Sequence, residues 1–334
     1  MAEQAAKPRV SIVVEWENAL LCEGDRSAVM LREVRRQAQA LVAGISAADE
    51  RQAGPPLELL LVYDPAEFDE GILTGLLDHH FGPAGDALRW RVLPTRDSGY
   101  YRNKDFGARS AAGDIIVFLD SDVIPEPGWL EQIVSGLADP AVRIVAGSAY
   151  IDPAGLIGKV FALTWFFPLR SKNGPLRAVN QFFANNLAMR RELYLRYPFP
   201  DLEETSRGAC LVLASELAQA NIAVYHNPRA RVAHPAPNGF AHISKRALAQ
   251  GRDRLYRERH YGSRWSASWP AACVRALRHC GGSAWKVCTN FRAVGLSPLL
   301  IPAAIAVAWY YYLLYWAGET LSQLRVPAIK RVRV

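Results

Sequence analysis

The sequence predicts an α/β fold with a mostly parallel central sheet, and three features of its first 140 residues support this expectation. Short, continuous apolar runs alternate with longer segments whose apolar residues have helical spacing. A run that is apolar throughout is typical of a parallel strand buried on both faces. Polar clusters follow several of these runs, at Glu15 to Asn18, at Asp64 and at Asp120 to Asp122. Ligands bind at the carboxyl ends of strands in such sheets, so these clusters mark the expected site.

The expected elements follow from this alternation. Strands are predicted over residues 10–14, 57–63, 88–93 and 115–119. Helices are predicted over residues 25–45, 68–81, 101–112 and 127–137. Beyond residue 145 the pattern is looser and predicts helices at 192–197, 210–220 and 244–260. A closing strand pair is expected at 222–225 and 232–234, separated by Asn227 and Pro228, because proline cannot donate to a strand ladder.

Charge is distributed unevenly along the chain. The net charge is +7, but residues 229–334 contain 17 basic and only three acidic residues. A basic segment suggests an anionic partner, either nucleic acid or a membrane surface. No Gly-rich phosphate loop of the Rossmann or Walker type is present, so a nucleotide would be held in another way. The five scattered cysteines lack disulfide or zinc spacing, and the polar N-terminus resembles no signal peptide, which together favour a cytosolic compartment.

An uncharged segment favours the membrane over nucleic acid. Residues 293–318 contain no charged side chain, and a bilayer core is crossed by roughly 20 apolar residues. Six Trp and Tyr residues within it are of the type that favours the membrane interface. A span would place the basic tail on the far side, against the usual charge rule, so we expect an in-plane or re-entrant anchor broken at Pro298 or Pro302. A buried C-terminal core helix is the alternative.

The stretch from Gly99 to Pro125 carries a resemblance to a known family. A Gly-containing helix, a tight A-x-G turn and an apolar strand lead into Asp120-Ser121-Asp122. This order resembles the nucleotide-sugar signature of family-2 glycosyltransferases. The blocks at 11–18, 184–191 and 221–234 are similar to other parts of that family, so the resemblance covers residues 8–236. It implies a GT-A fold, a UDP-, GDP- or TDP-sugar donor, and Mg²⁺ or Mn²⁺ as cofactor.

The resemblance assigns roles to the acidic motif. Asp122 is expected to bind the metal, and Asp120 the ribose and the metal. A divalent cation there neutralises the charge that develops on the leaving diphosphate, and oxygen ligands suit Mg²⁺ or Mn²⁺. His234 is expected either as a third metal ligand or as a structural histidine.

Further positions are expected to bind the donor or the acceptor. Glu15, Trp16 and Glu17 end the first strand, with Trp16 placed to stack on the base, and Asp64 is expected to contact the base. Lys104 is expected to hold a phosphate or the nucleotide. The predicted acceptor-side residues are Asn185, Asn186, Arg190 and Arg191.

The family's usual catalytic base is missing. Ala209 and Cys210 stand where the resemblance places a Glu-Asp pair, and a cysteine thiol is a poor base with a pKa of about 8.5. Three explanations stay open at this point. Glu203 or Glu204 supplies the base, the acceptor is already an anion such as a phosphate, or the chain binds nucleotide-sugars without transferring them.

The sequence therefore predicts a metal-dependent glycosyltransferase on the cytoplasmic face of the inner membrane, using a lipid-linked or other membrane-near acceptor and no nucleic acid. An inverting reaction in glycolipid or cell-envelope polysaccharide synthesis is expected. A non-catalytic nucleotide-sugar-binding or scaffold protein of the same fold is the alternative. The predicted domains are a GT-A domain at 8–236, a basic helical extension at 237–292, a hydrophobic membrane segment at 293–318 and a basic tail at 319–334.

Overall fold

The computed structural model describes residues 10–21, 25–43, 57–82, 88–96, 99–202, 207–330 and 332. The chain forms two compact units. The first comprises residues 1–149, 171–200 and 213–233, and the second comprises residues 150–170, 201–212 and 234–334. We describe each unit by itself, and the four domains expected from the sequence stay a prediction.

A nine-stranded sheet within the described residues forms the centre of the first unit. Its strands are β1 (Val10–Glu15), β2 (Leu57–Tyr63), β3 (Leu88–Pro94), β4 (Ile115–Asp120), β5 (Ile124–Pro125), β6 (Ile144–Ile151), β7 (Arg177–Val179), β8 (Asn186–Arg190) and β9 (Val224–His234). They lie in the order β3-β2-β1-β4-β8-β6-β9-β5, with β7 also paired to β9. The polar ends of β1, β2 and β4 therefore share one edge of the sheet.

The parallel half of the sheet confirms the strand predictions. Strands β1, β2, β3 and β4 pair in parallel, while β8 runs antiparallel to β4. Every residue of β1, β2 and β4 is buried, as continuous apolar runs predict for a parallel sheet covered on both faces. The sheet is thus mostly parallel where the expected site lies.

The predicted pair of closing strands is wrong, because a single long strand, β9, takes their place. Strand β7 pairs with Val224 to His226, and β5 pairs with Val232 and Ala233. Asn227 and Pro228 fall between these two short partners, so the missing amide hydrogen of Pro228 costs neither pairing a hydrogen bond. The Pro228 carbonyl still accepts a hydrogen bond from Ser171 Oγ at 2.9 Å.

Helices cover the sheet of the first unit at positions close to those predicted. They are α1 (Arg26–Ala43), α2 (Glu70–Phe81), α3 (Tyr100–Ser110), α4 (Trp129–Ser135), α6 (Arg191–Arg196) and α7 (Ala209–Gln219), whose first turn belongs to the second unit. A short 3₁₀ turn, η1 (Glu17–Leu21), follows β1. Helix α3 lies so close to β1 and β2 that a Cβ added at Gly107 would come within 2.5 Å of Val13 Cγ1. This close approach brings one face of α3 to the polar edge of β1 and β4.

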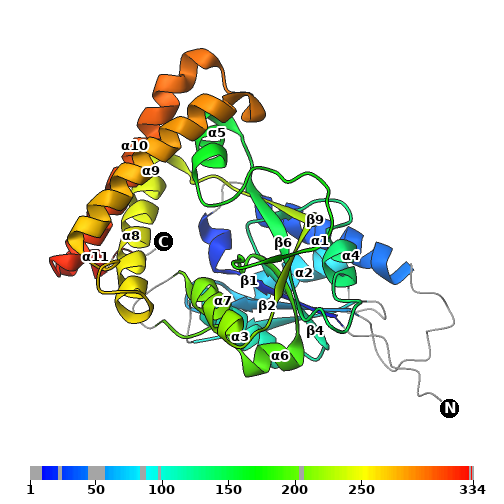
Figure 1. Cartoon of the computed structure of the whole chain (residues 1–334). Helices are drawn as coiled ribbons and strands as arrows, with labels where there is room; N and C mark the ends of the chain where they lie inside the picture. Colours follow the sequence, from blue (N-terminus) through cyan, green and yellow to red (C-terminus); the bar gives the residue numbers. More distant parts are fainter. Residues whose placement is uncertain are drawn as a thin grey trace. The chain divides into compact units, whose positions relative to one another are not determined.

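The second unit is helical in its described residues. It contains α5 (Gly155–Thr164), α8 (Gly239–Tyr261), α9 (Trp269–Asn290), α10 (Ile301–Gln323) and α11 (Pro327–Lys330), with short turns η3 (Phe291–Val294) and η4 (Pro298–Leu300) between α9 and α10. Helices α8, α9 and α10 lie side by side (Figure 1). The predicted basic helix corresponds to α8.

The apolar segment forms one continuous helix rather than a hairpin broken at Pro302. Pro302 lies in the first turn of α10, where a missing amide hydrogen is tolerated, and Pro298 opens η4 before it. Residues 298–323 are long and apolar enough to cross a membrane, judged by length and composition alone. Core helices of soluble proteins meet the same criteria, and α10 packs against α8 and α9.

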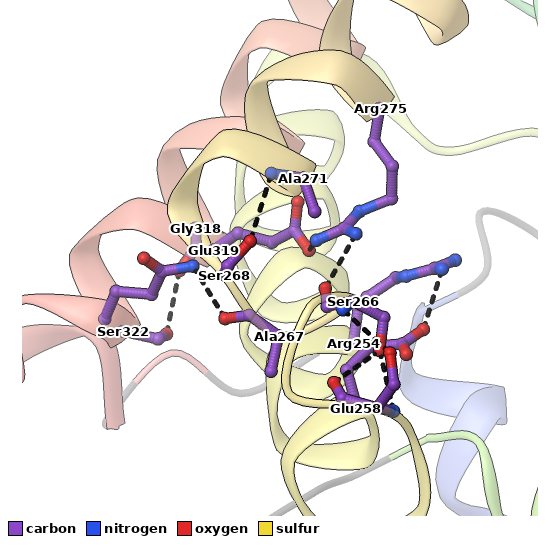
Figure 2. A network of polar contacts seen from close by, with 12 residues as sticks. Arg254, Glu258, Ser266, Ala267, Ser268, Ala271, Arg275, Gly318, Glu319 and Ser322 are labelled. Carbon is purple, nitrogen blue, oxygen red and sulfur yellow. Dashed lines mark hydrogen bonds and ion pairs between the residues drawn. The ribbon is translucent and has the colours of Figure 1, made fainter.

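The packing of α10 on α8 depends on two glycines. A Cβ at Gly251 of α8 would lie 2.0 Å from the Tyr315 carbonyl oxygen, and one at Gly318 of α10 would lie 2.2 Å from the Leu248 carbonyl oxygen. The two backbones therefore approach as closely as glycine permits. The buried Glu319 of α10 forms an ion pair of 2.6 Å with Arg275 of α9 (Figure 2), which joins the third helix to the pair.

Candidate active site

Two carboxylates lie side by side where β1 and β4 end. Glu15 and Asp120 are register partners on neighbouring parallel strands, so their side chains emerge at the same edge of the sheet. Asp120 is 2% exposed, and Asp122 follows two residues later at 4% exposure. Burial of several acidic groups in one place is costly unless cations or hydrogen-bond donors compensate them.

Three side-chain donors surround Asp120. Lys104 Nζ lies 2.7 Å from Asp120 Oδ1, and the lysine is fully buried. Tyr100, one turn earlier on α3, donates from its hydroxyl to the same oxygen at 2.9 Å. Asn18 Nδ2 donates to Asp120 Oδ2 at 3.3 Å. The lysine that the sequence predicted as a phosphate contact is therefore the cation that compensates Asp120, and these contacts fix the carboxylate at the end of its strand.

Glu15 has an altered acidity in this setting. Its pKa is raised well above the usual value, chiefly by burial and then by the negative charge of Asp120, while Lys104 acts in the opposite direction. Asn18 holds it from both sides, through its backbone amide at 3.3 Å and its side-chain amide at 2.7 Å. Burial and the adjacent carboxylate thus both oppose the charged form of Glu15.

The backbone after Asp120 is tied to the end of β9. Arg26 of α1 donates from Nε to the Asp122 carbonyl at 2.6 Å and from Nη2 to the Ala233 carbonyl at 2.8 Å. Ile124, two residues after Asp122, pairs with Ala233, which directly precedes His234. The guanidinium and the strand pairing together bring the last residue of β9 to the acidic motif.

Asp120, Asp122 and His234 form a cluster that could hold a metal ion. One ligand atom from each lies within 4.8 Å of the other two, and all three residues are buried. His234 Nδ1 lies 2.7 Å from the Pro235 carbonyl, which accepts a hydrogen bond only from a protonated nitrogen. That bond leaves Nε2 as the nitrogen with a lone pair for a metal. The two carboxylates are of the ligand type that suits Mg²⁺ or Mn²⁺, and an imidazole as third ligand favours Mn²⁺ over Mg²⁺.

The remaining predicted donor residues lie at or near the same edge. Trp16 follows β1 and is 4% exposed, and its amide donates to the Val62 carbonyl of β2 at 2.8 Å. Glu17 begins η1. Asp64 follows β2 and accepts a hydrogen bond from the Ala66 amide at 2.8 Å, so it orders the turn. No structural observation assigns a nucleotide contact to any of these, and their predicted roles stay predictions.

The four predicted acceptor-side residues separate into two pairs. Asn186 opposes Leu119, so Asn185 lies next to Asp120 by register, and the buried Asn185 Oδ1 has no hydrogen-bond partner among the described residues. The side chain of Asn186 instead accepts from Trp129 Nε1 at 2.8 Å and donates to the Ala230 carbonyl at 2.9 Å. Asn186 therefore holds β8 to its neighbours, whereas Asn185 presents an incomplete polar contact beside the acidic motif.

The arginine pair lies at the other end of β8, and its acceptor-side role stays a prediction. Arg190 pairs with Ile115 at the opposite end of β4 from Asp120, about 16 Å away at the usual rise of a strand. Its Nη2 donates to the Leu137 carbonyl at 2.7 Å, and Arg191 starts α6. The alternation of side chains along a strand predicts which face of the sheet a residue lies on, but not which end of the neighbouring strand it lies beside. Because β8 runs antiparallel to β4, these arginines lie away from the site.

The candidate base residues are the least defined. Glu203 and Glu204 lie outside the described residues, so their positions stay a prediction. Ala209 and Cys210 begin α7 and are buried. Sequence reasoning also missed Tyr100 and Arg26, whose contacts to the acidic motif come from helices distant in the chain, and only the spacing of Tyr100 and Lys104 on one helical face gave a signal.

The family comparison agrees with this geometry. The family described as "Glycosyl transferase family 2" matches residues 51–194, which contain β2, β4, Lys104 and the Asp120 motif. This part of the chain is similar to that family. The resemblance predicted from the sequence is thereby confirmed.

Two curated relatives of this chain carry the names of glycosyltransferases. The glucosyl-dolichyl phosphate glucuronosyltransferase of Haloferax volcanii is 25% identical over 197 residues, 55% of this chain and 60% of that protein. A probable N-acetylgalactosaminyltransferase 9 of Caenorhabditis elegans is 41% identical over 88 residues, 26% of this chain and 15% of that protein. The chain thus spans less than two thirds of the length of these relatives.

A solved structure shows the same fold. A mannosyltransferase from Pyrobaculum calidifontis, in complex with GDP-Man and Mn²⁺, superposes with a TM-score of 0.51 at 18% identity. The match covers 95% of this chain and 87% of the other. The predicted GT-A fold is confirmed.

Proposed function

We propose that this protein transfers a sugar from a nucleotide-diphosphate sugar to an acceptor at a membrane, with Mg²⁺ or Mn²⁺ held by Asp120, Asp122 and His234. The cluster of these three side chains at the carboxyl edge of the sheet carries the proposal. A cation there would supply the positive charge that a leaving nucleoside diphosphate requires. The binding of GDP-Man and Mn²⁺ by the similar Pyrobaculum enzyme supports this donor class.

Residues around the cluster have positioning roles in this proposal. Lys104, Tyr100 and Asn18 fix Asp120, so they act on the donor through that carboxylate. Trp16, Glu17 and Asp64 are the proposed contacts to the nucleotide, and Asn185 is the proposed contact on the acceptor side. Glu15 lies next to Asp120 on the neighbouring strand.

The acceptor is proposed to be anionic and lipid-linked. The absence of an acidic pair at Ala209 and Cys210 favours an acceptor that needs no base, because a phosphate oxygen is already deprotonated. Cationic side chains also gather near the end of β9 in the second unit. Burial, and after it the charges of Arg246, His234, Arg207 and Lys245, lower the pKa of His242 to about 4. The name of the Haloferax relative, which refers to a dolichyl phosphate, supports the same acceptor class.

The protein is proposed to act on the cytoplasmic face of the inner membrane. The apolar helix α10 and the basic helix α8 support attachment to an anionic surface. An inverting reaction in glycolipid or cell-envelope polysaccharide synthesis completes the proposal.

Donor cleavage is the first test of this function. The purified protein is offered UDP-, GDP- and TDP-sugars with Mn²⁺, Mg²⁺ or chelator, and released nucleoside diphosphate is measured. We expect metal-dependent release from one donor and its loss in Asp122→Asn, whereas Asp78→Asn, on an exposed helix position, keeps it. Equal release by the Asp122 variant would show that the cluster is not the metal site. Donor binding without release, with any acceptor, would favour the non-catalytic alternative.

A second assay separates the two explanations for the missing base. Transfer to a polyprenyl phosphate is compared between the unmodified chain and the double variant Glu203→Gln with Glu204→Gln. An anionic acceptor predicts that the double variant stays active. A loss of about 100-fold or more, the usual contribution of a general base, would instead assign the base to this pair.

A further inference from the structure

Helix α9 has an apolar stripe that faces away from its neighbours. Val274, Leu277 and Trp285 recur at helical spacing, and the last two are 74% and 72% exposed. Gly281 lies between them with open space around it. The buried positions of α9, such as Ser283 and Val287, lie on the opposite side of the helix. This stripe therefore has no partner among the described residues.

Helix α10 carries a second stripe that adjoins the first. Trp309 and Leu313 are 44% and 52% exposed, and Leu299 before the helix is 90% exposed. Trp309 Nε1 donates to the Cys280 carbonyl of α9 at 2.9 Å, and Cys280 stands beside Gly281 and one turn after Leu277. The two stripes thus form one surface, which we call the outer face, comprising Val274, Leu277, Trp285, Leu299, Trp309 and Leu313. Exposed apolar surfaces of this kind mark contact sites rather than ordinary solvent-facing helix.

The charges beside the outer face are of one sign. Arg278, Lys286 and Arg292 are exposed on or just after α9, and the sequence of α9 contains no acidic residue. Anionic headgroups attract such side chains, and Trp and Tyr side chains favour the headgroup boundary. The combination of aromatic, aliphatic and basic groups fits an anionic lipid surface.

The packing of α10 opposes its insertion across a bilayer. It is held along its length: Tyr310 hydrogen-bonds Ser244 of α8 at 2.7 Å, and Gly318 meets the α8 backbone. At its far end Arg275 binds Glu319, and Gln323 donates to the Ala267 carbonyl at 3.3 Å (Figure 2). A spanning α10 that kept these contacts would carry Arg275 and the arginines of α8 into hydrocarbon, which is costly.

We propose that the outer face of α9 and α10 lies flat on an anionic bilayer surface, in the plane of one leaflet, and that α10 does not cross the membrane. This inference deepens the proposed membrane attachment and rests on it. The aliphatic and indole side chains enter the boundary between headgroups and acyl chains, as in other interfacial helices. The basic side chains of α9 remain among the headgroups.

Vesicle binding tests the outer face. The full chain is floated with phosphatidylcholine vesicles that contain or lack phosphatidylglycerol. Leu277→Ser and Leu313→Ser are each expected to weaken binding about tenfold, because each leucine loses the transfer of its side chain from water. Ile72→Ser, at a 71% exposed apolar position of α2, is the matched control and keeps full binding. Arg278→Gln and Lys286→Gln each weaken binding about fivefold, only on the anionic vesicles.

Topology tests the in-plane orientation. A C-terminal tag on protein bound to sealed vesicles from outside is expected to remain fully cleavable by added protease, and a tag protected in the lumen overturns the proposal. The exposed thiol of Cys288, close to Trp285 on α9, is expected to react with a water-soluble maleimide several-fold more slowly on anionic vesicles. Unchanged labelling, unchanged binding of the leucine variants, or self-association through this face without vesicle binding would each overturn it. Donor release, measured on the same variants without lipid, is expected to stay unchanged, so a failure of the sugar-transfer proposal is recognised separately.

Discussion

The buried ion pair between Lys104 and Asp120 gives a prediction whose size follows from the structure. At 2.7 Å and an effective dielectric constant of about 20, the attraction is about 6 kcal/mol. Burial of both groups offsets much of this attraction, but the removal of one partner leaves the other charge without compensation. Such changes typically cost about 3–5 kcal/mol. We therefore expect Lys104→Met to lower the melting temperature by about 6–20 °C, at roughly 2–4 °C per kcal/mol for a unit of this size.

Scanning calorimetry on matched variants measures this effect. Lys172→Met, at an exposed lysine of the same unit, is expected to melt within about 2 °C of the unmodified chain, because exposed substitutions rarely exceed 0.5 kcal/mol. Adding Asp120→Asn to Lys104→Met is expected to recover part of the loss, since it removes the uncompensated charge. If Lys104→Met has the same melting temperature as the Lys172→Met control, Asp120 is not stabilised by Lys104, and the argument for the arrangement of the site fails.

Three further predictions concern other parts of the chain. Asn186→Ala leaves two buried partners unsatisfied and is expected to destabilise the first unit by about 2–4 kcal/mol, measured by denaturant titration. Burial, with nearby cationic side chains, lowers the pKa of His279 to about 4. Between pH 6.5 and about 4 the unfolded chain binds a proton on His279 that the folded chain does not bind, so the free energy of unfolding falls as the pH is lowered through this range. His279→Gln should reduce this pH dependence, and an unchanged dependence contradicts the assignment. Gly251→Ala should destabilise the helices of the second unit by about 1–3 kcal/mol, because its Cβ would meet the Tyr315 carbonyl. Gly281→Ala, which has open space around it, should stabilise them by about 0.5–1 kcal/mol. Equal melting temperatures of the two variants would refute the close packing of α8 and α10.

Local sequence patterns were sufficient for the parallel half of the sheet. The strands that end in Glu15, Tyr63 and Asp120 are short and mainly apolar, as is typical of strands buried on both faces of a parallel sheet. The position of the acidic motif followed directly, because the carboxyl ends of parallel strands meet at one edge. The helix expected at residues 101–112 was predictable from the same alternation, and it corresponds to α3.

Long-range partners decided what the sequence could not predict. Pro228 predicts a strand break locally, yet β9 continues through it, next to β6 in the sheet and with β7 and β5 paired before and after the proline. Arg190 follows an asparagine pair beside the site, but the antiparallel direction of β8 takes it to the other end of β4. The contacts of Arg26 with Asp122 and Ala233 join residues about 100 and 200 positions apart, and no local pattern reports such a pairing.

The lysine beside Asp120 has a consequence for the order in which ligands arrive. The formal charges of Asp120, Asp122 and Lys104 sum to one negative charge at this edge of the sheet. A divalent cation alone would reverse that sign among buried side chains, whereas a cation paired with the two negative charges of a nucleotide-sugar diphosphate would leave it unchanged. We expect metal and donor to enter as a pair, with each raising the affinity of the other, so that free Mn²⁺ is bound weakly.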